Sequence, residues 1–121
     1  ETLEFCMQAG FKVNANVILG WNNLTDQDLL DLEVFMDSLS GHTITTLQLR
    51  WLFAHPYTKI YDTYDGVEDT IRLGPFNCGF NVKVDARQKE LNLAAAKIIK
   101  EKCDLKHIKL EGYNNLRKGQ L

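Results

Sequence analysis

Hydrophobic and polar residues alternate along two segments in the first half of the chain, residues 11–20 and 43–54. This period of two predicts a β-strand in each segment. Between them, hydrophobic residues recur every three or four positions, which predicts an amphipathic helix that Thr25 caps at its start and Gly41 ends. We expect the hydrophobic faces of both strands to pack beneath helices; these residues are Val13, Ala15, Val17, Leu19, Leu47, Leu49, Trp51 and Phe53.

A strand, a helix and a second strand in this order normally form a right-handed crossover, in which both strands are parallel and belong to one sheet. The chain is therefore predicted to have an α/β fold. Strands of such sheets usually consist of near-continuous apolar residues, because helices bury both faces. Here one face is polar instead, with Asn14 and Asn16 on the first strand and Gln48 and Arg50 on the second.

This polar face has two interpretations. Asn14 and Asn16 are suited to hydrogen-bond a ligand inside a barrel or in the cleft of an open sheet. Arg50 would then need an anion or a paired carboxylate, because an unpaired buried charge is costly, and a ligand carboxylate would bind it through two hydrogen bonds. The alternative is an edge strand with one solvated face and no ligand.

His55 follows the second strand at its carboxyl end, where α/β folds place their binding sites. It is a candidate substrate-binding residue, with an exposed loop histidine as the alternative. The sequence contains no nucleophile elbow and no C-x-x-C or H-E-x-x-H spacing. We therefore assign neither a catalytic residue nor a metal ligand.

Weaker patterns follow in the second half of the chain. Residues 70–73 and 80–84 are short apolar runs set among glycines, which fits a hairpin or two edge strands. Asp85 with Gln88 resembles a capping box, which predicts a helix over about 86–102.

The two ends of the chain also show local patterns. Residues 1–9 have helical spacing that Gly10 ends, with no capping residue before them, so we expect a piece of a longer protein. Residues 106–110 fit a short last strand. The sequence leaves open whether residues 63–121 form a second small domain or complete the first.

Composition narrows the class of protein. A length of 121 residues, with 45% hydrophobic and 25% charged residues, is typical of one soluble globular domain. The net charge of -2 would not attract nucleic acid or anionic lipid, and no apolar run approaches the roughly 20 residues of a membrane span. Cys6, Cys78 and Cys103 make no disulfide framework, which favours a cytoplasmic protein.

Two segments, AGFKVNANVILGWNNLTDQDLLDLEVFMDSL and LQLRWLFAHPYTKIYD, together resemble the C-terminal half of a radical S-adenosylmethionine domain. The matching elements are 17–20, 25–28 and 56–61, and the similarity covers roughly residues 1–62. The resemblance implies a TIM-like partial barrel of six strand–helix units, of which this chain would hold about the last two. Residues 63–121 would then be a short α+β C-terminal extension with turns or short strands, one helix and a terminal strand.

The same resemblance implies a function and cofactors. Enzymes of this family use a [4Fe–4S] cluster to cleave S-adenosylmethionine and generate a 5′-deoxyadenosyl radical. The three-cysteine motif that binds the cluster is absent, so the ligands would lie upstream and this piece alone would be inactive. Ile18 and Gly20 would contact the adenine, Asn16 the ribose or amino acid part, and Gln48 or Arg50 a carboxylate of cofactor or substrate.

The sequence departs from the family pattern at Asn16 and Asn23, which stand where a glycine and a glutamate are usual. Two other functions remain open. One is a different α/β-barrel or doubly wound enzyme that uses Arg50 and His55 at the carboxyl ends of its strands. The other is a small non-catalytic interaction domain. The expected partners are a small-molecule cofactor and an unknown substrate, with neither membrane nor nucleic acid.

Overall fold

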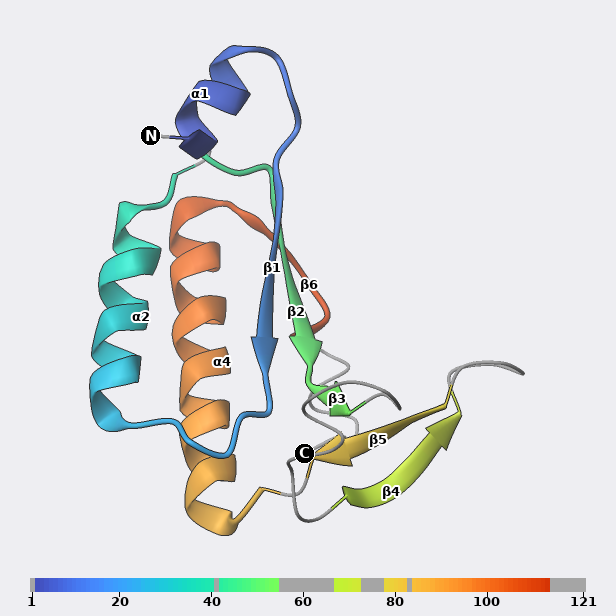
Figure 1. The fold of residues 1–121 in the computed structure, drawn as a ribbon. Coiled ribbons are helices and arrows are strands. Elements are labelled where there is room, and N and C mark those ends of the chain that lie inside the picture. The colour runs from blue at the N-terminus through green and yellow to red at the C-terminus, as the bar shows by residue number, and fades with distance from the viewer. Residues whose placement is uncertain (1, 41, 55–66, 73–77, 83, 114–121) are drawn as a thin grey trace.

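The computed structural model describes residues 2–40, 42–54, 67–72, 78–82 and 84–113. Its strands form two sheets of three, ordered β1-β2-β6 and β3-β5-β4 (Figure 1). The elements in chain order are α1 (Thr2–Gln8), β1 (Asn14–Leu19), α2 (Asp26–Ser38), β2 (Thr46–Trp51), β3 (Phe53–Ala54), β4 (Val67–Arg72), β5 (Cys78–Val82), α4 (Ala86–Lys106) and β6 (Lys109–Glu111).

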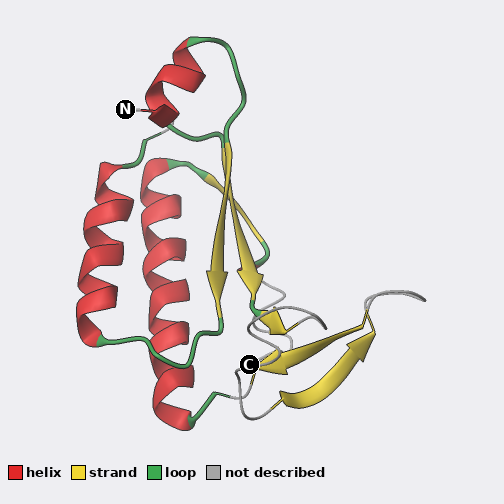
Figure 2. Cartoon of the chain, viewed as in Figure 1, coloured by secondary structure: helices red, strands yellow, loops and turns green. Residues whose placement is uncertain are grey.

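The sheet β1-β2-β6 is entirely parallel. β1 pairs with β2 from Asn14↔Thr46 to Leu19↔Trp51, and β2 pairs with β6 through Gln48↔Glu111. This confirms the predicted parallel neighbours. Helices α2 and α4 lie side by side on one face of the sheet (Figure 2). The fold is therefore α/β with two layers, and the sheet is not closed, so the partial barrel stays a prediction.

The core lies between this sheet and the two helices. Its centre consists of Leu47 and Leu49 from β2 with Met36 and Ile99 from the helices, all buried. The predicted inward face of β2 is confirmed through Trp51, whereas the side chain of Phe53 lies outside the described residues. On β1, the inward residues are less covered: Leu19 is buried, but Val13, Ala15 and Val17 are only partly buried.

Local capping explains where the helices begin. The Thr25 hydroxyl accepts a hydrogen bond from the Asp28 N–H, and the Asp28 carboxylate accepts one from the Thr25 N–H, which completes a capping box. Asp85 caps α4 by accepting from the Gln88 N–H. The Gln88 side chain does not return to the cap, however, because it bonds the loop after β1 instead.

Helix α4 is longer than predicted. It continues past Lys102 to Lys106, because Cys103 extends its buried side and Lys106 Nζ donates to the carbonyls of Asp37 and Leu39 at the end of α2. Its C-cap is His107, in the left-handed conformation with φ 55°. The predicted last strand consequently starts later, at Lys109.

The second predicted strand does not run unbroken to Ala54. It is interrupted at Leu52, whose N–H still donates to the Leu19 carbonyl. The chain then enters the second sheet as β3, which pairs antiparallel with β5. β4 and β5 pair antiparallel, as one of the two alternatives for this region predicted.

The structure answers the question left open for the end of the chain. α4 packs on α2 and β6 pairs with β2, so residues 86–111 complete the layers that begin with β1. The predicted boundary at residue 62, between the part that resembles the radical S-adenosylmethionine domain and its C-terminal extension, stays a prediction. Among the described residues, no helix is long and apolar enough to cross a membrane.

Candidate site on the polar face of the sheet

Helices α2 and α4 cover one face of the β1-β2-β6 sheet (Figure 2), and no helix of the described residues lies on the other, which we call the open face. Asn14, Asn16, Ile18 and Arg50 are exposed on this open face, and Gln48 is half-buried. In the parallel register Asn16 lies beside Gln48 and Ile18 beside Arg50. Side chains at paired positions point to the same face, so the structure brings five of the predicted site residues together.

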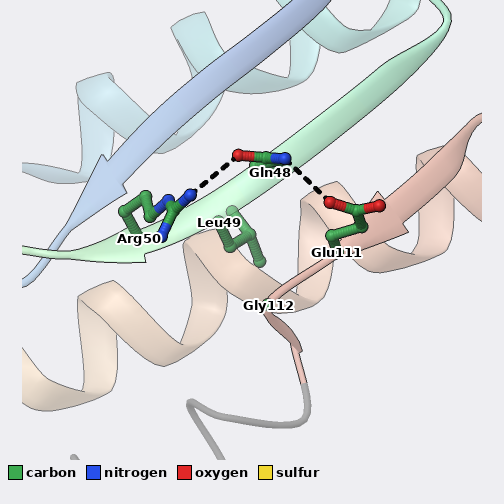
Figure 3. Close-up of a pocket in the computed structure, with 5 residues that line it drawn as sticks. All are labelled: Gln48, Leu49, Arg50, Glu111 and Gly112. Carbon is green, nitrogen blue, oxygen red and sulfur yellow. Dashed lines mark hydrogen bonds between the residues drawn. The ribbon is translucent and has the colours of Figure 1, made fainter.

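A chain of polar contacts crosses this face from β2 to β6 (Figure 3). Arg50 Nη2 donates to Gln48 Oε1 at 3.0 Å, and Gln48 Nε2 donates to Glu111 Oε2 at 2.8 Å. Lys109 Nζ lies 3.3 Å from the other Glu111 oxygen. The Gln48 amide therefore bridges the Arg50 guanidinium and the Glu111 carboxylate.

The charges at this site act mainly on Glu111. Hydrogen bonds from Lys109 and then Gln48 hold the pKa of its carboxyl below the ordinary value of 4.5, with a smaller contribution from the Arg50 charge. Hydrogen bonds to the ionised form favour that form. Glu111 is therefore a carboxylate at neutral pH, beside the cationic Arg50.

A shallow depression of about 180 Å³ lies between the two strands. It is lined by Gln48, Leu49, Arg50, Glu111 and Gly112. This volume is below the roughly 300 Å³ at which pockets for drug-sized ligands begin. The depression accommodates a small polar group, and a larger ligand would extend from it over the open face.

Gly112 and Gly20 are required by the backbone around the site. Gly112 has φ +87°, and a Cβ there would collide with the Leu49 carbonyl oxygen, so only glycine lets the end of β6 approach β2. Gly20 has φ +98°, and a Cβ there would lie 2.7 Å from the Trp51 indole. The backbone conformation and the contact with Trp51 thus explain why residue 20 is a glycine without invoking a ligand. The contact of Gly20 with the cofactor stays a prediction.

Asn92 holds the loop that follows β1. Its side chain is fully buried, and its Oδ1 accepts from the Gly20 N–H at 2.7 Å. Its Nδ2 donates to the Trp21 carbonyl at 2.7 Å and to the Gln88 carbonyl at 2.8 Å. One turn earlier, Gln88 makes two hydrogen bonds to the backbone of Leu24. Together they fix the carboxyl end of β1 against α4.

Sequence reasoning missed Glu111 and Asn92. Glu111 lies one residue beyond the predicted last strand, 106–110, although the alternation of Ile108 and Leu110 with Lys109 and Glu111 would have placed it on the polar face. Asn92 lies one turn before Ala96 on the apolar stripe of α4, and a polar residue at such a position needs a buried partner. His55 lies outside the described residues.

Neither a metal site nor a thiol site is assembled from the described residues. Among the described residues, no group of three His, Cys, Asp or Glu side chains is placed to hold a metal ion. Cys103 is buried, and burial raises the pKa of its thiol, which disfavours the reactive thiolate. The described part of this chain therefore does not fit an iron–sulfur cluster.

Comparison of the chain with protein-family models, with curated proteins and with solved structures finds no match.

Proposed function

We propose that the open face of the β1-β2-β6 sheet is the ligand-binding face of a radical S-adenosylmethionine enzyme, of which this chain forms the C-terminal part. The observation that carries the proposal is the polar chain Arg50–Gln48–Glu111 beside Asn16 and Ile18, on a parallel sheet whose described helices cover only the other face. In a partial barrel, this uncovered face would be the one that points to the interior.

The side chains on this face complement the chemical groups of S-adenosylmethionine. Arg50 and Glu111 offer opposite charges that complement the carboxylate and ammonium of its amino acid end. Ile18 is 45% exposed and offers an apolar surface to the adenine, while Asn14 and Asn16 offer amides to the ribose. The backbone held by Asn92 and Gln88 keeps the loop after Ile18 in one conformation for binding.

The cofactor, this chain and the iron–sulfur cluster have separate tasks in this proposal. When bound, the cofactor supplies the reductively cleaved bond and hence the radical chemistry. This chain would orient the cofactor, fix its charged end and exclude water from one side. The [4Fe–4S] cluster would require cysteines outside the described residues. The cytoplasmic location expected from the unpaired thiols belongs to the same proposal.

The decisive test uses the protein encoded with its sequence upstream of Glu1. After anaerobic iron–sulfur reconstitution and reduction, we expect 5′-deoxyadenosine from S-adenosylmethionine, and a reduced yield with Arg50→Ala. Lys97→Ala, on the exposed side of α4, is the matched control. An upstream frame without three closely spaced cysteines, or no 5′-deoxyadenosine from a reconstituted protein, would refute the proposal.

A second candidate, a non-catalytic interaction domain, is favoured by a different observation. The β1 side of the sheet is less covered than the rest of the core. An interaction domain would use that side, and it would bind no S-adenosylmethionine.

A further inference from the structure

The hydrophobic core is unevenly covered from one side of the sheet to the other. On β2 the inward residues Leu47, Leu49 and Trp51 are 0, 3 and 5% exposed. On β1 the paired residues Ala15 and Val17 are only partly buried, as are Val13 just before the strand and Leu29 and Leu32 of α2. Leu19, which pairs with Trp51, is buried at 4% exposure. The apolar layer is therefore incomplete beside β1, which we call the β1 side.

The backbone of β1 also presents hydrogen-bonding groups on this side. The Val13 carbonyl accepts from the N–H groups of Thr45 and Thr46 at the start of β2, and the Leu19 carbonyl accepts from Leu52 just after it, so odd-numbered positions face β2. Carbonyls alternate along a strand, and those of Asn14 and Asn16 therefore face the other edge. The Ile18 carbonyl, at the end of that edge, accepts from Trp21 Nε1.

Within the part of the chain that the structure describes, this edge is neither paired nor blocked by its own residues. Among the described strands, none pairs with β1 beyond β2. The sequence NANVIL contains no charge and no proline, which are the common devices that block an edge. The edge can therefore accept a strand at Asn14 and Asn16.

Helix α2 gives this side a negative charge. The helix contains five acidic residues and no basic one in DQDLLDLEVFMDS. Asp26 and Asp37 face α4, where they pair with Arg87 and Lys102. Asp28, Asp31 and Phe35 recur at spacings of three and four and so share a different side of the helix, which we call the acidic flank. Phe35 there is 45% exposed.

Helix α4 carries the complementary pattern. Arg87 and Lys102 face α2, whereas Lys89, Leu93 and Lys100 recur on another side, which we call the basic flank. Lys100 Nζ lies 2.7 Å from both Asp104 oxygens, so Lys89 is the cation of this flank without an ion pair within 4 Å among the described residues. Leu93 is 47% exposed, which matches Phe35. Beyond β6, next to this helix, no further strand pairs among the residues described.

We propose that a second copy of this chain docks head to tail on the β1 side. Its β6 continues the parallel sheet beside β1, and its α4 places the basic flank against the acidic flank of α2. This contact repeats between copies the α2–α4 packing that exists within one copy, where Asp26 meets Arg87 at 3.0 Å and Asp37 meets Lys102 at 2.6 Å.

The charges of the two flanks favour this head-to-tail arrangement over a two-fold dimer. A two-fold pairing of β1 with β1 would place two acidic flanks against each other, and like charges across an interface are strongly unfavourable. The head-to-tail contact pairs opposite charges and can recur on each new copy. It therefore predicts species larger than a dimer and an association that salt weakens.

Sedimentation velocity of the 121-residue chain, over about a hundredfold range of concentration, measures this directly. We expect species beyond the dimer that dissociate as salt is added. A monomer at every concentration, or a dimer that salt strengthens, would overturn the proposal.

Charge-reversed variants make the test specific. Asp31→Lys neutralises the acidic flank, because Asp28 remains, and Lys89→Glu with Lys100→Glu makes the basic flank acidic, so each variant alone should associate at least about tenfold more weakly. An equimolar mixture should recover association, because the unaltered acidic flank of the Lys89→Glu, Lys100→Glu variant then meets the unaltered basic flank of the Asp31→Lys variant. Failure of the mixture to associate more strongly than either variant would contradict the contact.

Asn16→Pro tests the strand edge separately. Its N–H faces the open edge, so proline removes a donor for the incoming strand but none from the β1–β2 ladder. We expect a folded monomer by circular dichroism and sedimentation, and unchanged association would overturn the edge pairing. In the longer enzyme proposed above, an upstream strand–helix unit would take the β1 side in place of a second copy. Association of the 121-residue chain and ligand titration on the polar face therefore test the two proposals separately.

Discussion

The two faces of the β1-β2-β6 sheet come from the same strands but have opposite chemistry. On β2, Leu47, Leu49 and Trp51 are buried against helices, while Gln48 and Arg50 between them form a polar chain with Glu111. Alternate residues of β2 thus stabilise the fold on one face and present polar and charged groups on the other. The covered face should determine stability, and the open face should determine binding.

The largest expected effect lies at the centre of the covered face. Leu47→Ala removes a fully buried side chain and leaves a cavity, so we expect a loss of about 3 kcal/mol in the free energy of unfolding. Its neighbour Gln48, on the open face, is the matched control, and Gln48→Ala should change stability by less than about 0.5 kcal/mol. Urea unfolding measures both, and equal losses would contradict the division between faces.

Asn92 tests whether the buried polar network belongs to the covered face. Asn92→Leu keeps the number and branching of the side-chain heavy atoms but leaves the Gly20 N–H and the Trp21 carbonyl without their partner, which should cost about 2 kcal/mol. Hydrogen exchange at the Gly20 amide should accelerate more than at amides in the middle of β2. Protection of Gly20 at the wild-type level would show that the loop does not depend on Asn92.

Gly20→Ala should have a somewhat smaller effect. It forces an alanine into a backbone with φ +98° and places its Cβ against the Trp51 indole, so we expect a loss of about 1–2 kcal/mol. Gly10→Ala is the matched control, because Gly10 has a similar φ of +89° but nothing within 4 Å of a Cβ. If both variants lose the same stability, the contact with Trp51 contributes nothing.

How far the sequence predicts this molecule differs between the two faces. The period of two along residues 11–20 and 43–54 predicted both strands and the residues on each face, because burial imposes that period. The helix between them predicted the parallel pairing. The polar chain was predicted only in part. Arg50 and Gln48 were assigned to the polar face, but Glu111 was not, since its strand of three residues carries too short a pattern.

The missed features depend on contacts between distant segments. Asn92 meets Gly20 across 72 positions, and Gln88 meets Leu24 across 64. A capping pattern at Asp85 and Gln88 predicted the start of α4 correctly, yet not that the Gln88 side chain would be used elsewhere. Local pattern specifies elements, and tertiary packing decides which partner a polar side chain takes.

The smallest expected effect concerns pH and belongs to the open face. The pKa of Glu111 is lowered in the folded protein, so its contribution to stability is present above the unfolded value of 4.5 and is lost as pH falls through the folded pKa. Glu111→Gln should flatten that acid dependence slightly and leave neutral stability nearly unchanged. The carboxyl carbon shift of Glu111, followed by NMR, should titrate below 4.5, and titration above that value would contradict its bonds to Lys109 and Gln48.

Binding by the open face is tested most directly by titrating S-adenosylmethionine into the 121-residue chain and following backbone amide shifts by NMR. We predict shifts at Asn14, Asn16, Ile18, Gln48 and Arg50, with little change along the outer side of α4, and weaker binding by Arg50→Ala than by Lys97→Ala. Shifts confined to other surfaces, or none at saturating ligand, would show that the polar face is only a solvated surface.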